Sequence, residues 1–313
     1  MSASPLVSIV LPVYNGAEYV QNAIDSVLAQ TYANFELIAV DDCSTDNTLE
    51  ILKANAKRDS RIKVLSNETN LKLPRTLNAG FAAAGGKYLT WTSDDNKYKP
   101  NALETMVAAL ESDDKADMVY ADYTNIDADD NDIAEVPLAE PDALVVGNCY
   151  GACFLYTRRI AEQIGPYDAD LFLAEDYDYW LRIHAAGCVV HLSENLYWYR
   201  RHAKSLTETR KAQINTQTLK AIEKNLDSML ASAKTTGREN FLFDHMLSCV
   251  DEGNRGAMYK RICALSPAYP KHVRQLKRQV LKDRIRNTLV GQILVKIKRA
   301  IRGLSTSVAS RRA

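Results

Sequence analysis

Three pairs of acidic residues, each placed just after a short apolar run, constrain the fold of this chain more than any other feature. The pairs are Asp41 with Asp42, Asp94 with Asp95, and Glu175 with Asp176. Each is typical of a strand's carboxyl end opening into a loop, where open α/β sheets bind ligands. Carboxylates about 4 Å apart repel by roughly 4 kcal/mol at an effective dielectric of about 20, so a cleft that gathers several favours a cation. We therefore expect an α/β sheet whose acids meet in one cleft, beside a divalent metal and a phosphorylated ligand.

The first part of the chain alternates between apolar runs and segments with helical spacing of apolar residues. This alternation predicts a mostly parallel sheet with helices on both faces. The expected strands cover residues 7–11, 35–40, 62–65, 88–92 and 118–123. The expected helices cover residues 19–29, the segment around 49–52, residues 75–84 and a segment that begins at Pro100.

After residue 132 the pattern changes to a mixed one. The expected strands there cover residues 151–156, 189–192 and 195–199, and the expected helices cover residues 158–164 and 177–186. From about Thr207 onward the residues favour helix almost throughout. We therefore expect one α/β domain over residues 1–205, with halves 1–123 and 124–205, followed by a helical region over residues 206–313.

The composition indicates a cytosolic protein. No run approaches the roughly 18 apolar positions of a membrane span, and the first residues lack the segments of a signal peptide. Six cysteines spread along 313 residues favour reduced thiols. Cys149, Cys153, His184 and Cys188 could be joined as zinc ligands, but no pair has the tight spacing typical of such sites.

The C-terminal tail is basic, although the 39 basic and 39 acidic residues of the chain balance to zero. Beyond Asn254 the single acid is Asp283. An apolar stripe recurs every four residues, at Ile285, Leu289, Ile293, Ile297 and Ile301, while basic residues lie mostly off it. This pattern predicts an amphipathic helix on an anionic membrane surface; the alternative is packing on the protein or on a second subunit. No nucleic-acid recognition motif accompanies it, so we expect no nucleic-acid partner.

Three acidic loops carry separate expectations. Residues 41–46 end a strand and open a helix, so an acid there could accept the imide N–H of uracil or thymine; alternatively, Ser44 and Asp46 cap the helix. Residues 91–96 end the fourth strand, where one or two acids suit Mg²⁺ or Mn²⁺ shared with a diphosphate; a surface turn is the alternative. Residues 127–132 lack the glycine of a calcium loop, so a hairpin turn is expected there.

Taken together, the motifs of residues 5–205 resemble the family 2 glycosyltransferases, in the family's order and spacing. They are VSIVLPVYN at 7–15, QTY at 30–32, FELI at 35–38, DDCSTD at 41–46, GKY at 86–88, DD at 94–95 and EDYDYWLR at 175–182. By this resemblance the fold is GT-A. Residues 1–123 would then be the nucleotide-sugar half and residues 124–205 the acceptor half.

The resemblance implies a role for each matching residue of the first half. Pro12, Tyr14 and Asp42 would contact the nucleotide base and ribose, Asp94 would contact the ribose, and Asp95 would bind Mn²⁺ or Mg²⁺ beside the donor diphosphate. Thr92 stands where the family often has another acid. This resembles the Thr-x-Asp-Asp-Asn variant of a spore-coat member and leaves the metal with fewer protein carboxylates.

In the second half, Asp176 matches the family's catalytic base, which would take the proton of an acceptor hydroxyl, and Glu175 would orient Asp176 or the acceptor. The alternative is a charged first helical turn favoured by the macrodipole, and both can hold. His202 lies in a further matching segment and would approach the diphosphate or metal, although a structural histidine is the alternative. Lys72 and Arg75 precede the third helix and are further phosphate candidates.

These expectations predict a metal-dependent, inverting hexosyltransferase. It would move a sugar from a UDP- or dTDP-linked donor to a hydroxyl of a surface polysaccharide or lipid-linked glycan precursor, in the cytoplasm or at the inner face of the plasma membrane. Inversion follows from the resemblance. The alternative is a non-catalytic sugar-nucleotide-binding or scaffold protein of a glycan assembly system. A dinucleotide-binding dehydrogenase is not expected, because residues 12–16 lack the glycine-rich turn that its cofactor needs.

Overall fold

The computed structural model describes residues 4–275 and 277. The chain forms two compact units, Met1–Asp251 and Glu252–Ala313. The first unit contains a nine-stranded sheet and helices α1 to α10, and helix α11 (Arg255–Leu265) belongs to the second. The first unit therefore continues well past residue 205, where we expected the α/β domain to end.

The core of the first unit is a parallel sheet, as the alternation predicted. Its strands are β1 (Val7–Val13), β2 (Phe35–Asp41), β3 (Ile62–Ser66) and β4 (Tyr88–Trp91), in the order β3-β2-β1-β4. All three pairings among them are parallel. Connections leave β1 toward β2 on one side, whereas β4 lies on its other side, so the carboxyl ends of β1 and β4 flank a topological switch point.

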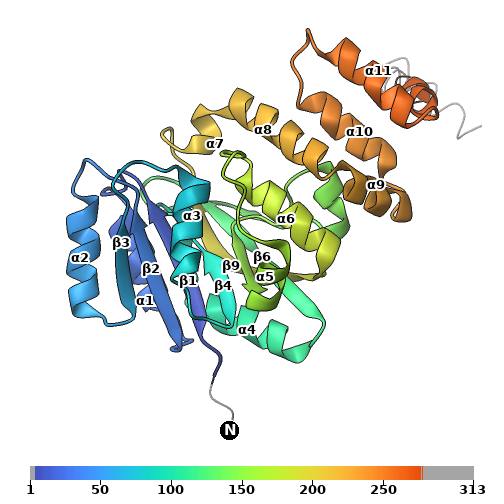
Figure 1. The fold of residues 1–313 in the computed structure, drawn as a ribbon. Helices are drawn as coiled ribbons and strands as arrows, with labels where there is room; N and C mark the ends of the chain where they lie inside the picture. Colours follow the sequence, from blue (N-terminus) through green and yellow to red (C-terminus); the bar gives the residue numbers. More distant parts are fainter. Residues whose placement is uncertain (1–3, 276, 278–313) are drawn as a thin grey trace, which may run out of the picture. The chain divides into compact units, whose positions relative to one another are not determined.

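Helices cover both faces of this sheet (Figure 1). They are α1 (Val20–Leu28), α2 (Thr48–Arg58), α3 (Leu73–Ala82) and α4 (Ala102–Ser112). Alternate residues of β1 explain the two layers, because Ile9 lies in one core cluster with α1 and α4, whereas Val10 faces α3. A Cβ at Gly80 of α3 would lie 2.4 Å from a Val10 methyl carbon. The close approach of α3 to β1 therefore requires glycine at this position.

The second half of the sheet is mixed, as expected. It contains β5 (Lys97–Tyr98), β6 (Ala116–Ile126), β7 (Asp132–Val136), β8 (Cys153–Thr157) and β9 (Cys188–Arg200). Strand β8 runs antiparallel to β4 and β6, and β9 runs parallel to β6. The two strands expected over residues 189–199 are one strand, β9, with register shifts against β6 that absorb its irregular middle. The turn at residues 127–131 closes the expected hairpin between β6 and β7.

Helices of the second half lie around this sheet. They are η1 (Pro141–Val146), α5 (Arg158–Ile164), α6 (Glu175–Ala186), α7 (Leu206–Thr209), α8 (Lys211–Lys224), α9 (Leu226–Thr235) and α10 (Glu239–Ser248). Helix α6 packs against α8 and α9, and η1 packs against α10. Helices α8 and α9, which follow residue 205, are thus packed on the helix that carries Glu175 and Asp176.

Several sequence expectations concern features outside this core. The amphipathic stripe from Ile285 to Ile301 lies outside the described residues. None of the helices within residues 4–275 has the length and apolar character that a membrane crossing needs. The four zinc candidates have separate surroundings: Cys153 is buried in β8, Cys188 is exposed, and His184 contacts the Tyr150 and Ser232 hydroxyls.

Candidate functional site

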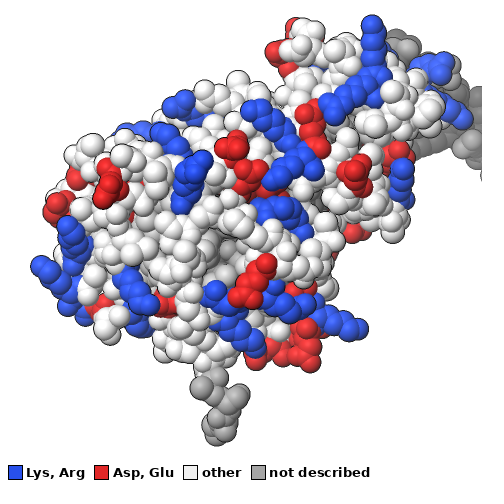
Figure 2. Space-filling view, in the orientation of Figure 1, with Lys and Arg blue, Asp and Glu red and all other residues white. Residues whose placement is uncertain are grey.

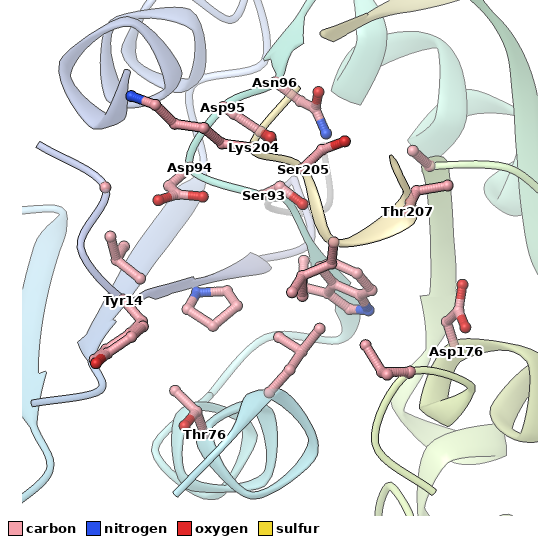
Figure 3. A pocket seen from close by; sticks show the side chains of 18 of the residues that line it. Tyr14, Thr76, Ser93, Asp94, Asp95, Asn96, Asp176, Lys204, Ser205 and Thr207 are labelled. Atoms are coloured by element: carbon pink, nitrogen blue, oxygen red, sulfur yellow. The ribbon is translucent and has the colours of Figure 1, made fainter. Parts of the chain in front are cut away.

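A cleft of about 760 Å³ lies at the carboxyl ends of β1, β2 and β4 and extends to the start of α6. Of the residues that the sequence pointed to, it is lined by Pro12, Tyr14, Asp42, Lys72, Asp94, Asp95, Glu175, Asp176 and His202. Arg75 does not line it, and neither does Asp41, which is 1% exposed. In Figure 3, Asp94 and Asp95 lie toward one side of the pocket and Asp176 toward another, with Tyr14 on the wall nearest β1. Segments more than 80 residues apart in the chain thus converge on one cavity.

The carboxylate of Asp42 is already held by the protein. It accepts hydrogen bonds from the backbone N–H of Leu71 at 2.8 Å, from that of Lys72 at 3.0 Å and from Asn67 Nδ2 at 2.8 Å. A carboxylate can accept about four hydrogen bonds, so one position remains for a ligand. Asp42 therefore both faces the cleft and fixes the loop that carries Lys72, whose φ of 69° lies in the left-handed region.

Asp94 lies against the backbone of the loop after β1. A Cβ at Gly16 would lie 1.8 Å from Oδ2 of Asp94, so a side chain at Gly16 and the observed position of this carboxylate are incompatible. Removal from water, followed by the charge of Asp95, raises the pKa of Asp94 above the usual range of an aspartate. A cation or a hydrogen-bond donor from a ligand would relieve this repulsion.

Arg200 and His202 hold Asp95 in place, and one of its carboxylate oxygens has no partner among the described residues. Arg200 Nε donates to its backbone carbonyl at 2.9 Å, and His202 Nε2 lies 3.0 Å from its Oδ2. Oδ1 is buried and has no hydrogen-bond partner among the described residues. A buried carboxylate oxygen without a partner raises the free energy of the folded protein unless a ligand or an ion binds it. Asp95 and His202 together could therefore hold part of a metal's coordination shell.

Thr92 does not add a ligand to this group. It is 1% exposed, and its hydroxyl is hydrogen-bonded to the Tyr197 hydroxyl in the core. Within residues 4–275 and 277, no three Asp, Glu, His or Cys side chains are grouped so that they could hold a metal ion by themselves. A cation at Asp95 would therefore need oxygen atoms from a ligand to complete its shell.

Glu175 and Asp176 form the first turn of α6 on another side of the cleft. Glu175 is 5% exposed, and its Oε2 accepts the N–H of Leu173 at 2.7 Å, which holds Leu173 at a φ of 80°. Burial, followed by the charge of Asp176, raises the pKa of Glu175. Burial also raises the pKa of Asp176, although its Oδ2 accepts a hydrogen bond from Asn148 Nδ2 at 2.8 Å that favours the charged form.

Two basic residues differ from the expectation from the sequence. Arg75 is exposed on α3 and does not line the cleft, although Lys72 does. Lys204 lines it instead and forms an ion pair with Glu18 at 2.8 Å. The signal was present, because Lys204 follows the recognised segment that ends at His202 by two residues.

On the face of the first unit shown in Figure 2, basic and acidic side chains are interspersed over the surface.

Comparison with known proteins identifies a family model and relatives that match this chain. The family model described as Glycosyl transferase family 2 matches residues 8–165. An uncharacterized glycosyltransferase of Rickettsia prowazekii is 35% identical over 220 residues, which are 66% of this chain and 67% of that protein.

Solved structures show the same fold. The mannosyltransferase PcManGT from Pyrobaculum calidifontis, in complex with GDP-Man and Mn²⁺, has a TM-score of 0.60 at 16% identity, over 95% of this chain and 85% of that one. S. aureus TarS in complex with UDP-GlcNAc has a TM-score of 0.57 at 16% identity, over 87% of this chain and 91% of that one. At this identity the likeness shows the fold alone, and it is the expected GT-A fold.

Proposed function

The chain belongs to glycosyl transferase family 2, a family of sugar-transferring enzymes, and from this premise we propose that it transfers a hexose from a UDP- or dTDP-linked donor to a hydroxyl, with inversion. The observation that carries the proposal is that Asp42, Asp95 and Asp176 line one cleft. Inversion in one step needs the leaving diphosphate and the attacking hydroxyl on opposite sides of the sugar. Separate placement of Asp95 and Asp176 within the pocket supports that arrangement.

The nucleotide would bind on the side formed by β1 and β2. Tyr14 is 51% exposed at the cleft wall, and its ring offers a surface for a base. The remaining acceptor position of Asp42 suits an imide N–H, which uracil and thymine share. Two solved structures of the same fold are complexes with UDP-GlcNAc and with GDP-Man, so a nucleotide-sugar donor is consistent with the fold.

A divalent ion fits the next part of the cleft. Asp95 and His202 would hold Mn²⁺ or Mg²⁺, since Oδ1 of Asp95 is buried without a partner among the described residues and hard cations prefer such oxygens. A bound ion would supply Lewis-acid stabilisation of the departing diphosphate. Lys72, on the cleft wall, would add positive charge near the phosphates, whereas the charge of Lys204 is already paired with that of Glu18.

Asp176 would accept the proton of the acceptor hydroxyl. Its raised pKa makes it a stronger base than an exposed aspartate, and Asn148 restricts its side chain by a hydrogen bond. Glu175 would act as a positioning residue, because its carboxylate bonds the backbone of the preceding turn. The acceptor would be a surface polysaccharide or a lipid-linked glycan precursor.

A screen of nucleotide sugars tests this proposal. We expect a UDP- or dTDP-sugar with Mn²⁺ to raise the melting temperature most, because a ligand at about 100 times its dissociation constant stabilises by about 2.7 kcal/mol. The stabilising donor should then be consumed when candidate acceptors are added, and its sugar should appear in a product of inverted anomeric configuration. Stabilisation without any sugar transfer or donor hydrolysis would instead indicate a non-catalytic sugar-nucleotide-binding protein.

The place of the reaction is a separate part of the proposal. We place it in the cytoplasm, with the basic tail at the inner membrane face. Flotation with anionic liposomes, compared between the full chain and a chain lacking residues 282–313, tests the role of the tail. Equal flotation of the two proteins would contradict it.

A further inference from the structure

Helix α6 presents two aspartates on opposite sides of its first turn. Successive residues of an α-helix are separated by about 100°, so Asp176 and Asp178 point about 200° apart. Asp176 lines the cleft, whereas Asp178 is 0% exposed on the far side. Whatever holds Asp178 therefore also determines how Asp176 faces the cleft.

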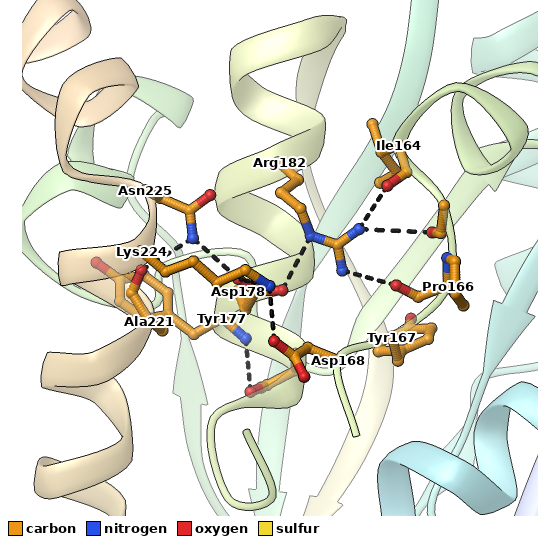
Figure 4. Close-up of polar contacts among 12 residues, drawn as sticks. Ile164, Pro166, Tyr167, Asp168, Tyr177, Asp178, Arg182, Ala221, Lys224 and Asn225 are labelled. Carbon is orange, nitrogen blue, oxygen red and sulfur yellow. Dashed lines mark hydrogen bonds and ion pairs between the residues drawn. The ribbon is translucent and has the colours of Figure 1, made fainter. Parts of the chain in front are cut away.

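Helix α8 and its end hold Asp178 (Figure 4). Asn225 Nδ2 donates to Oδ1 at 2.9 Å, and Lys224 Nζ lies 3.7 Å from the same oxygen. Arg182, one turn further along α6, donates from Nε to Oδ2 at 2.9 Å. Each carboxylate oxygen thus accepts one hydrogen bond, and two of the three partners, Asn225 and the ion-paired Lys224, come from beyond residue 205.

Arg182 and Lys224 also bind the loop that leads into α6, at residues 164–168. Arg182 donates to the carbonyls of Ile164 at 2.8 Å and Pro166 at 3.0 Å, and Lys224 pairs with Asp168 at 2.6 Å. This loop continues to Phe172 and Leu173, which line the cleft beside Asp176. The residues before α6 and its first turn are therefore fixed to one helix from a distant part of the chain.

Asp176 itself has little else to orient it. Within the described chain its side chain contacts the amide of Asn148 and the N–H of Tyr177, its own neighbour in α6. The first turn of α6 must consequently be held from outside. A displacement of about 1 Å in a reacting group can cost about 100-fold in rate, so such a support matters for turnover.

We propose that Lys224 and Asn225 are positioning residues for the catalytic base, acting through Asp178. The inference rests on the proposed function, since it assumes that Asp176 accepts a proton. Donor binding would depend on the ends of β1, β2 and β4, whereas the side-chain hydrogen bonds and ion pairs of Lys224 and Asn225 go to Asp168, Asp178 and Ala221. Their loss should therefore reduce turnover and leave nucleotide affinity intact. Lower turnover at unchanged nucleotide affinity would distinguish positioning of the base from general support of the fold.

The experiment compares the unchanged 313-residue chain with four variants: Lys224→Met, Asn225→Leu, the double variant and Lys224→Arg. Lys220→Met is the control, because Lys220 is an exposed lysine on the same helix. We expect the double variant to lower kcat by about 10- to 100-fold while the dissociation constant of UDP with Mn²⁺ stays within about twofold. Lys224→Arg should restore most of the activity lost in Lys224→Met, and Lys220→Met should behave as the wild type.

Hydrogen exchange gives a readout that does not need turnover. In the double variant, amides of residues 174–178 should exchange faster, whereas those of residues 10–16 should not change. Unchanged kcat together with unchanged exchange at residues 174–178 would overturn the proposal. Weaker UDP binding together with equally faster exchange at residues 174–178 and 10–16 would also overturn it. If the wild type transfers no sugar from any donor, the proposed function fails, and the exchange comparison alone decides whether these residues hold the first turn of α6.

Discussion

The two sides of the cleft are built in different ways. On the side of the strand ends, Asp42 follows β2 and Asp95 follows β4, the two strands that flank β1 in the parallel sheet, so the sheet's own hydrogen bonds bring them to one edge. On the side of α6, Asp176 begins a helix that is supported by α8 and by the loop at residues 164–168. The comparison teaches that the donor side is positioned by secondary structure, whereas the proposed base is positioned by tertiary contacts.

The two sides also differ in what satisfies their carboxylates. Asp42 accepts three hydrogen bonds from the protein, while Asp95 keeps a buried oxygen without a partner among the described residues. Asp176 is partly buried and has a raised pKa. A ligand would thus bind the free oxygen of Asp95 on the donor side, and a proton would bind the carboxylate of Asp176 on the other side.

The largest effect should come from Asp176→Asn. Asparagine keeps the size of the side chain but cannot accept the acceptor's proton, so kcat should fall by about 10²- to 10⁴-fold. The dissociation constant of UDP, measured by calorimetry, should stay close to that of the wild type because the strand ends are unchanged. Retained turnover would remove Asp176 from the role of base.

Asp95→Asn should affect the other side. Loss of the charge next to His202 should weaken metal-dependent nucleotide binding by at least about tenfold, by analogy with changes that disturb metal sites. The measurement is UDP affinity at increasing Mn²⁺ concentration, with Asp114→Asn, an exposed acid away from the cleft, as the control. An unchanged Mn²⁺ titration would contradict the assignment of Asp95.

Gly16→Ala tests the close packing of the donor side. The added methyl would meet Oδ2 of Asp94, so we expect a loss of about 1–3 kcal/mol in the free energy of unfolding and weaker nucleotide binding. Gly256→Ala is the matched control, since a Cβ at Gly256 meets nothing within 4 Å. Similar denaturation midpoints for the two variants would show that the loop after β1 can move away from Asp94.

The smallest effect should be a displacement of the pH profile. Asp176 must be ionised to accept a proton, and its pKa is raised, so kcat should fall at pH values where an ordinary aspartate, with a pKa of about 3.9, stays ionised. Asn148→Ala removes a hydrogen bond that favours the charged form and should move this acid limb to higher pH. A limb that moves to lower pH would show that another group controls it.

Much of this molecule could be predicted from local patterns. The strands β1 to β4, their helices and the acids at their ends follow from apolar spacing, and the carboxyl ends of parallel strands lie at one edge of the sheet. Patterns were less informative in the second half, where β9 appeared as two strands. There the pairing of β6 with β9 and the packing of α6 against α8 override the local signal.

The sequence by itself determined the order of elements, the family and the acids that line the cleft, because each depends on residues close together in the chain. Only the tertiary structure decided that Lys72 lines the cleft and Arg75 does not, and that Asp178 faces helix α8. The physical reason is that the direction of a side chain depends on the rotation of its helix, and contacts from distant segments set that rotation.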